Sequence, residues 1–210
     1  ANCLSVNVIY IKGGYVFIQE RGNANHGRVK YQASAAGFVG LPANYKNTQE
    51  KTPHLMTAIR HETEEEMGMS FDSCIEAGTM QLTGIVRDRY NCEIGVLAMA
   101  KIKDEWYRSQ DNRKINEVVE DNDVVKITIE TGAETKDFVK LPFEPKRIFL
   151  FVLRNASRRN DIFEPWNDFM PLGAAALIYA LIKEFGERFV QREWKEAIAL
   201  YESEQPKLRS

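Results

Sequence analysis

The chain is poor in the features that mark secreted, zinc-binding or membrane-spanning proteins. Its three cysteines, Cys3, Cys74 and Cys92, are odd in number and show no C-x-x-C spacing. This usage indicates neither a disulfide framework nor structural zinc, and it favours a reduced, cytoplasmic setting. The longest apolar stretch, around residues 173–182, is about half of what a membrane span needs. The N-terminus has no basic-then-apolar signal pattern, so we expect a soluble protein without a membrane partner.

A strong charge of either sign is also absent. The 28 Lys and Arg residues nearly balance the 30 Asp and Glu residues, which gives a net charge of −2. The basic residues do not gather into one run, so a nucleic-acid partner is not indicated. The apolar content of 44% is enough for a sizeable core. We assign residues 1–210 to one domain, with its core at about 4–155 and a C-terminal helical segment at about 171–204.

The hydrophobic pattern predicts strands with interspersed helices. The run Lys12-Gly13-Gly14 joins the first two strands and is typical of a hairpin. Strands are expected at 4–11, 15–19, 30–36, 79–86, 92–102, 124–129, 138–141 and 147–153. Helices are expected at about 53–67, 172–185 and 187–203, with an irregular or partly helical insert at 104–123. This order predicts a mixed sheet covered by helices, an α/β (α+β) fold.

The helix that ends at Gly68 has an unusual inward face. Leu55 and Ile59 lie on one side of it, and Glu62 and Glu66 continue that stripe at helical spacing. A merely solvated acidic face would lie opposite the apolar stripe. The inward stripe itself therefore becomes acidic in the second half of the helix.

Glu62, Glu65 and Glu66 lie three and four residues apart, which makes them neighbours on the helix surface. Three carboxylates this close repel one another unless they protonate or share a cation. The spacing therefore predicts a metal site, and carboxylate oxygens suit Mg²⁺ or Mn²⁺. The alternative interpretation is an exposed acidic patch near the end of a helix.

The segment of residues 60–69 resembles the second half of the Nudix box, R-E-U-x-E-E-x-G-U, where U is a bulky apolar residue. Upstream, residues 34–39 resemble the strand end and glycine loop that precede the helix in this family. The glutamate and glycine positions of the motif are filled here by Glu62, Glu65, Glu66 and Gly68, and Met69 occupies its final apolar position.

The resemblance implies a Nudix-like α/β/α sandwich with a mixed sheet and extra C-terminal helices. It also implies hydrolysis of a diphosphate linkage in a small-molecule nucleoside diphosphate derivative, with Mg²⁺ or Mn²⁺ as cofactor. It assigns the catalytic and metal-binding roles to Glu62, Glu65 and Glu66, with His61 as an orienting residue and Gly37 beside the metal. Further candidates are Arg87 and Arg89 for phosphate, and Glu93, Glu117 or Glu120 as an additional acidic residue.

The chain departs from the motif in two ways. His61 occupies the position of the arginine that holds a catalytic glutamate in place in the family, and Thr63 replaces an apolar residue. Residues 38–60 form a longer spacer between Gly37 and His61 than the motif has. A second interpretation is therefore a degenerate Nudix-like module that binds a nucleotide or a protein without turnover. A third, an isomerase of the isopentenyl diphosphate type, ranks last because residues 34–36 lack the reactive cysteine of that class.

Other conspicuous residues have plainer interpretations. Packing is expected for Trp106, Trp166 and Trp194, and surface positions for His26 and His54. The choice of substrate is expected to depend on the inserts at 38–52 and 104–123. A homodimer is the default expectation for the oligomeric state.

Overall fold

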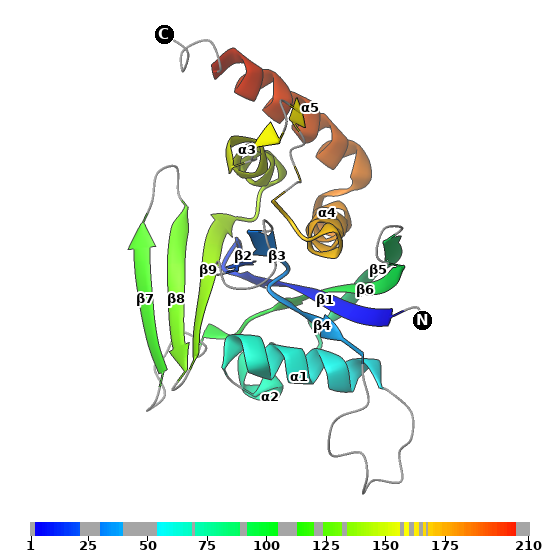
Figure 1. Ribbon diagram of the computed structural model, residues 1–210, viewed down its shortest axis with the longest axis vertical. Coiled ribbons are helices and arrows are strands. Elements are labelled where there is room, and N and C mark those ends of the chain that lie inside the picture. The colour runs from blue at the N-terminus through cyan, green and yellow to red at the C-terminus, as the bar shows by residue number, and fades with distance from the viewer. Residues whose placement is uncertain are drawn as a thin grey trace, which may run out of the picture.

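The computed structural model describes residues 3–21, 30–39, 54–68, 70–88, 92–104, 113–119, 124–131, 134–155, 158–159, 162–163, 166 and 168–204. In this part of the chain, five helices enclose a mixed sheet. The helices α1 (Leu55–Met67) and α2 (Phe71–Cys74) cover one face. The other face carries α3 (Pro145–Asn155), α4 (Pro171–Phe185) and α5 (Glu187–Glu204) (Figure 1). The predicted α+β sandwich with a mixed sheet is confirmed.

Seven strands form the main path of the sheet, and two short strands lie off it. The path runs through β5 (Gln81–Asp88), β6 (Glu93–Lys101), β1 (Cys3–Lys12), β2 (Tyr15–Glu20), β9 (Glu134–Pro142), β8 (Val125–Thr131) and β7 (Arg113–Val119). The short strands are β3 (Tyr31–Gln32), which pairs with β2, and β4 (Ala35–Phe38), which pairs with β1. A separate small sheet joins β10 (Arg158–Arg159) to β11 (Ile162–Phe163).

Strand β1 changes partner along its length. It runs parallel to β6 throughout, but its end pairs with β2 from Tyr10 onward, whereas its first half pairs with β4 up to Val8. At the change of partner, the buried Ser34 hydroxyl accepts a hydrogen bond from the Tyr10 N–H at 2.9 Å. The same hydroxyl donates to the carbonyl of Phe17. Ser34 thus satisfies backbone groups of both β1 and β2 at the point where β2 and β4 diverge.

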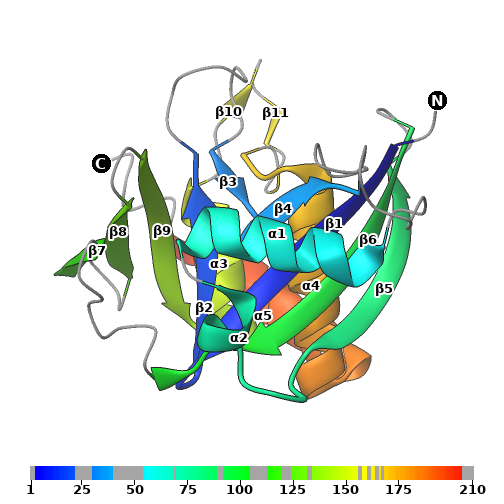
Figure 2. The same ribbon diagram turned by 90° about the horizontal axis from the view of Figure 1, so that it is seen from below.

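Alternation along β1 divides its side chains between two hydrophobic cores. Val6, Val8 and Tyr10 pack in the core under α1 and α2. Ile9 and Ile11 pack in the core under α3, α4 and α5. Because successive strand residues point to opposite faces, one strand supplies both cores. Viewed from below, α1 lies across β1 and β4 (Figure 2).

Helix α1 ends as the sequence predicted. Gly68 adopts a left-handed conformation with φ 65°, and its N–H donates to the carbonyl of Glu64. Thr63, which departs from the apolar residue of the motif, is buried and accepts a hydrogen bond from the hydroxyl of Tyr10. Its own hydroxyl donates to the carbonyl of Ile59 at 2.6 Å. A polar residue is thus accommodated at this inward position because both of its hydrogen-bonding roles are used.

Two of the predicted elements are wrong. Residues 147–153 were expected to form a strand but belong to α3, which begins at Pro145. A short apolar run cannot be assigned to strand or helix by periodicity alone, and proline is favoured in a first helical turn. The polar insert at 104–123 contains β7, the outermost strand, which pairs with β8 over seven residues. The predicted break at Gly186 between α4 and α5 is confirmed.

The aromatic residues of the C-terminal layer pack against one another. The ring centroid of Phe149 on α3 lies 6.4 Å from that of Trp166 and 5.0 Å from that of Trp194 on α5. Both ring pairs have an edge-to-face arrangement. Packing is therefore confirmed for these two tryptophans. His54 is exposed as expected. Trp106 and His26 lie outside the described residues. In the part of the chain that is described, no helix is both long and apolar enough to cross a membrane.

Candidate metal centre

Glu62 lies directly over the backbone of Gly37. A Cβ atom built on Gly37 would overlap the Glu62 carboxylate, so only glycine leaves room for it at this position of β4. The Glu62 side chain is 14% exposed, which confines its carboxylate between the helix and the strand. The structure thus brings together two residues that the sequence assigned to one site, from elements separated by residues 39–54.

Glu65 and His61 complete a compact group with Glu62. Donor atoms from these three side chains all lie within 4.8 Å of one another. The Nδ1 atom of His61 is 3.8 Å from Oε1 of Glu62 and 3.7 Å from Oε2 of Glu65. These separations allow attraction to a protonated imidazole, but His61 is 70% exposed, so water screens that attraction. The group is open to solvent on the side of Glu65 and closed on the side of Glu62.

Burial and neighbouring charge act together on Glu62. Burial raises the pKa of the Glu62 carboxyl above its ordinary value, and the charges of Glu65 and Glu66 raise it further. His61 and Lys136 oppose this rise in pKa and do not cancel it. The ionised form of Glu62 is thus less favourable in the folded chain than in water, and a cation bound nearby would stabilise this ionised form.

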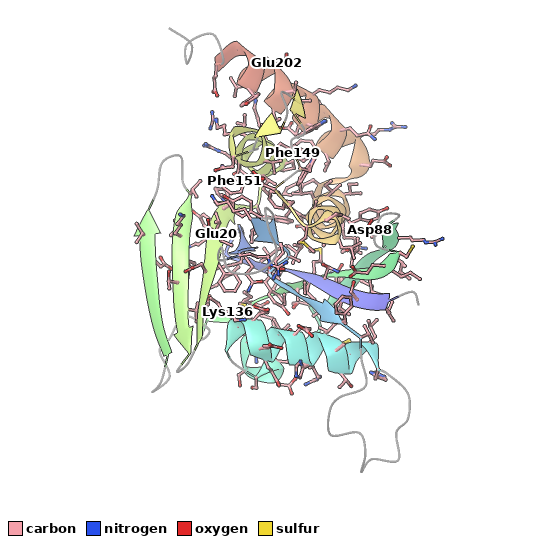
Figure 3. All side chains as sticks on the ribbon, viewed as in Figure 1. Glu20, Asp88, Lys136, Phe149, Phe151 and Glu202 are labelled. Carbon is pink, nitrogen blue, oxygen red and sulfur yellow. The ribbon has the colours of Figure 1, made fainter. Side chains whose placement is uncertain are left out.

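Glu66 occupies a different environment from the other two glutamates. It is 8% exposed and lies outside the group formed by His61, Glu62 and Glu65. Its Oε2 accepts a hydrogen bond from Nε2 of Gln19 on β2 and lies 3.2 Å from Nζ of Lys136 on β9. Figure 3 shows Lys136 on the α1 side of the sheet. The charge of Glu66 is therefore already compensated by side chains of the sheet.

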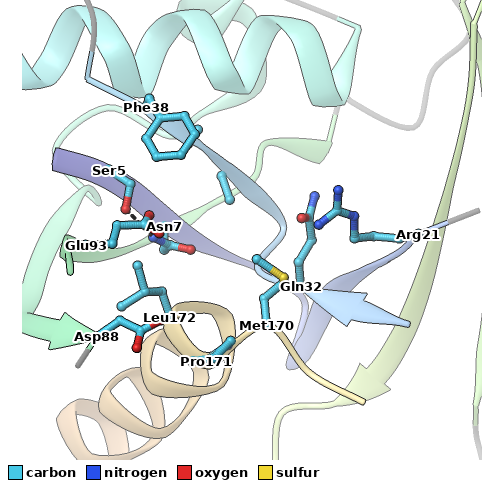
Figure 4. A pocket seen from close by; sticks show the side chains of 12 residues that line it. Ser5, Asn7, Arg21, Gln32, Phe38, Asp88, Glu93, Met170, Pro171 and Leu172 are labelled. Atoms are coloured by element: carbon cyan, nitrogen blue, oxygen red, sulfur yellow. Dashed lines mark hydrogen bonds between the residues drawn. The ribbon is translucent and has the colours of Figure 1, made fainter. Parts of the chain in front are cut away.

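A pocket of about 190 Å³ includes Gly37 in its wall, although His61, Glu62 and Glu65 do not line it. Most of its wall lies on the α4 face of the sheet, where Ser5 and Asn7 of β1 meet the start of α4 (Figure 4). The wall also includes Gly37 and Gln32. The remaining lining residues are Arg21, Ala36, Phe38, Asp88, Glu93, Met170, Pro171 and Leu172. The pocket therefore reaches the backbone on which the Glu62 carboxylate rests.

Close packing of α4 on the sheet shapes this pocket. A Cβ atom on Gly173 would lie 2.7 Å from the backbone nitrogen of Ala33, and one on Gly95 would lie 2.8 Å from the side chain of Leu172. Both glycines therefore permit a close approach that side chains would prevent. The first residues of α4 are held against β3 and β6, where they form one wall of the pocket.

The other sequence-predicted residues lie apart from the acidic group. Arg87 is exposed within β5, opposite Ile94, and not in the strand connection where it was expected, because β5 runs on to Asp88. Glu93 begins β6 and lines the pocket. Glu117 lies on the outermost strand, with its Oε1 3.9 Å from Nζ of Lys140. Arg89 and Glu120 lie outside the described residues.

Gln19 and Lys136 were not among the residues predicted from the sequence, although one signal for Gln19 was present. Along β2, Phe17 and Gln19 face the α1 side, so Gln19 is a polar residue at an inward position. This is the same departure from pattern that identified the acidic stripe of α1. Lys136 gave no such signal, because only the pairing of β9 with β2 brings it to Glu66.

Comparison with known proteins adds little to this geometry. No family model matches the chain, and no curated protein matches it. Among solved structures, the chain is similar to DR0079 from Deinococcus radiodurans, with 12% sequence identity and a TM-score of 0.41. That likeness covers 76% of this chain and 77% of the other.

Replacing Gly37 with alanine tests the contact between β4 and Glu62. The overlap is with the end of a flexible side chain, so the fold should be retained while the carboxylate is displaced. We expect the affinity for Mn²⁺ to fall roughly tenfold, about 1.4 kcal/mol. Titration of Mn²⁺ followed by electron paramagnetic resonance measures this. The same substitution in a Glu62→Gln background is the control: an equal loss there would show that Gly37 does not act through Glu62.

The raised pKa of Glu62 predicts a pH-dependent gain in stability for Glu62→Gln without metal. Because the folded state binds the proton more tightly, the wild type loses stability as the pH rises from the ordinary glutamate pKa, about 4.3, through the folded value. Glutamine removes this loss. The melting temperature at pH 7 should rise by roughly 2–4 °C for each kcal/mol of unfolding free energy gained. The gain in melting temperature should vanish below pH ~4, where the Glu62 carboxyl is protonated in both the folded and the unfolded state. A gain that persists at that pH would show that the raised pKa of Glu62 is not its cause. Glu202→Gln, at an exposed position on α5, is the control.

Proposed function

We propose that this protein is a metal-dependent hydrolase of the Nudix type, which cleaves a diphosphate linkage in a nucleoside diphosphate derivative. The observation that carries the proposal is the Glu62 carboxylate, held over Gly37 beside Glu65 and His61. Its position agrees with the motif that the segment of residues 60–69 resembles. A carboxylate that is both buried and surrounded by like charge is costly unless a cation shares the site.

The donor set fits a divalent cation. Glu62 and Glu65 offer carboxylate oxygens close together, and the exposed side of Glu65 leaves room for water and a substrate phosphate. Hard oxygen donors with open positions suit Mg²⁺ or Mn²⁺. When bound, such a cation would neutralise charge on the phosphoryl oxygens and make water a better nucleophile. Glu62 and Glu65 would hold it, and Glu66 would join them through Oε1, which has no hydrogen-bond partner among the described residues.

The pocket supplies a place for the part of the substrate beyond the diphosphate. Phe38 on its rim is 63% exposed, and an exposed ring can stack on a planar group. Asn7 is buried in the wall, and its Nδ2 donates to the Ser5 hydroxyl at 3.3 Å. Within the described part of the chain, its Oδ1 makes no hydrogen bond, so it can accept one from a ligand. Gly37 belongs to both places, because its backbone lines this pocket and the Glu62 carboxylate lies over it.

One observation favours a second function, nucleotide binding without turnover. Lys136 neutralises the buried Glu66, which reduces the need for a cation at this end of the group. His61, in the arginine position of the motif, lies beside Glu62 and Glu65 rather than Glu66. A module that binds a nucleotide in the pocket through protein groups alone would be compatible with both contacts.

The proposal predicts that phosphate or nucleotide is released from a panel of nucleoside diphosphate derivatives in the presence of Mg²⁺ or Mn²⁺. Glu62→Gln and Glu65→Gln should each lower kcat/KM by about 100-fold, or about 2.7 kcal/mol, because each removes a carboxylate from the cation. Glu202→Gln on α5 should have no effect. Undiminished activity in both site variants would contradict the metal assignment. Saturable nucleotide binding without hydrolysis by the wild type would favour the second function.

A further inference from the structure

A chain of polar side chains connects the pocket to Glu66. Nε2 of Gln32 on β3 donates to Oε1 of Gln19 on β2, and Nε2 of Gln19 donates to Oε2 of Glu66 on α1. Gln19 and Gln32 are direct partners across the β2–β3 pairing. Gln32 lines the pocket, where it lies beside Arg21 (Figure 4). Two hydrogen bonds therefore separate a pocket-lining side chain from the buried glutamate of α1.

The direction of this chain is fixed by its last member. An ionised carboxylate can only accept hydrogen bonds, so Gln19 must present its amide NH₂ to Glu66. Its carbonyl oxygen then faces Gln32, which must donate. Gln19 is 5% exposed, so it has little freedom to exchange these partners for water. A change in the orientation of Gln32 is therefore transmitted to Glu66 through one amide.

The contacts leave Glu66 held at one oxygen. Gln19 and Lys136 both engage Oε2. Among the described residues, Oε1 has no hydrogen-bond partner. A hydrogen bond from β2 and an ion pair with β9 thus both act on Oε2 and leave the second oxygen available. If this inward position of β2 served packing alone, an apolar residue would be favoured there, because burying a polar side chain such as that of Gln19 costs free energy.

We propose that Gln19 and Lys136 are positioning residues for Glu66, and that Gln32 couples this positioning to occupation of the pocket. Lys136 places a positive charge 3.2 Å from Oε2 of the buried Glu66, and Gln19 sets the orientation of this carboxylate through its hydrogen bond. A substrate group that contacts Gln32 alters the hydrogen bond from Gln32 to Gln19. The orientation of the Glu66 carboxylate, to which Gln19 donates, changes with it. The inference rests on the proposed function, because Glu66 matters only if the acidic group binds a cation or acts on a substrate.

A double-mutant cycle at positions 19 and 32 tests the coupling. Methionine has nearly the volume of glutamine and makes no amide hydrogen bonds, so the variants are Gln19→Met, Gln32→Met and the pair. Three quantities are measured for each variant. The first is the affinity for Mn²⁺ without substrate, and the other two are kcat and KM for the best substrate of the panel. Gln19→Met should weaken Mn²⁺ binding by about 10- to 100-fold, the usual effect of losing a group that orients a metal ligand. Gln32→Met should add little in the Gln19→Met background, because the chain is already broken.

Lys136→Met and Lys136→Arg form a second pair. The methionine variant should lower kcat, because Glu66 loses its charged partner, while the arginine variant, which keeps the charge and a donor, should retain most of the activity. Gln191→Met, at an exposed position on α5, is the control for the glutamine variants. Circular dichroism and thermal melting confirm that each variant is folded; if Gln19→Met is not, the Gln32→Met and Lys136 variants decide.

The outcomes separate this inference from the proposed function. If the wild type binds Mn²⁺, an unchanged Mn²⁺ affinity in folded Gln19→Met together with an unchanged kcat in folded Lys136→Met would overturn the positioning roles alone. Additive losses at positions 19 and 32 would show that Gln32 acts only as a wall of the pocket, and would overturn the coupling. If the wild type neither binds Mn²⁺ nor hydrolyses any member of the panel, the proposed function fails and this inference fails with it.

Discussion

The burial of negative charge between α1 and the sheet is the constraint on which the site depends. The inward stripe of α1 begins as an apolar surface at Ile59 and ends with Glu62 and Glu66, both of which are largely withdrawn from water. Each charge needs its own compensation, since burying an unpaired carboxylate costs several kcal/mol. Glu66 finds it in Lys136 and Gln19. Glu62 lies over a glycine backbone, where His61 and Lys136 offset its charge only in part, and a divalent cation is the compensation that we propose there.

The change of partner along β1 allows side chains of the pocket, on the α4 face of the sheet, to contact residues on the α1 face. An unbroken pairing between β1 and β2 would separate the pocket from α1 by continuous backbone. Because β1 pairs with β4 up to Val8 and with β2 only from Tyr10 onward, polar groups lie where β2 and β4 diverge. Ser34 bonds to the backbones of β1 and β2 there, and Gln19 bonds to Gln32. The pocket consequently reaches both Gly37, under Glu62, and Gln32, which leads to Glu66.

Local signals were predictable from the sequence, and long-range pairings were not. The end of α1 at Gly68, the hairpin after Lys12 and the acidic inward stripe all follow from residues within a few positions of one another. The apolar run at 147–153 was misassigned because strand and buried helix share its composition. Strand β7 was missed because an outermost strand with a polar sequence lacks the hydrophobic signal of a core strand. The partners of Glu66 come from strands far away in the sequence, and only the order of the sheet brings them together.

The central claim is that a divalent cation compensates the charge of Glu62. Crystals grown with Mn²⁺ and measured on both sides of the manganese absorption edge would locate the ion by its anomalous scattering. The account predicts a peak within bonding distance of the carboxylates of Glu62 and Glu65, about 2.0–2.3 Å from their oxygens. A saturated Mn²⁺ soak with no peak at these carboxylates, or with the ion bound only elsewhere, would contradict it.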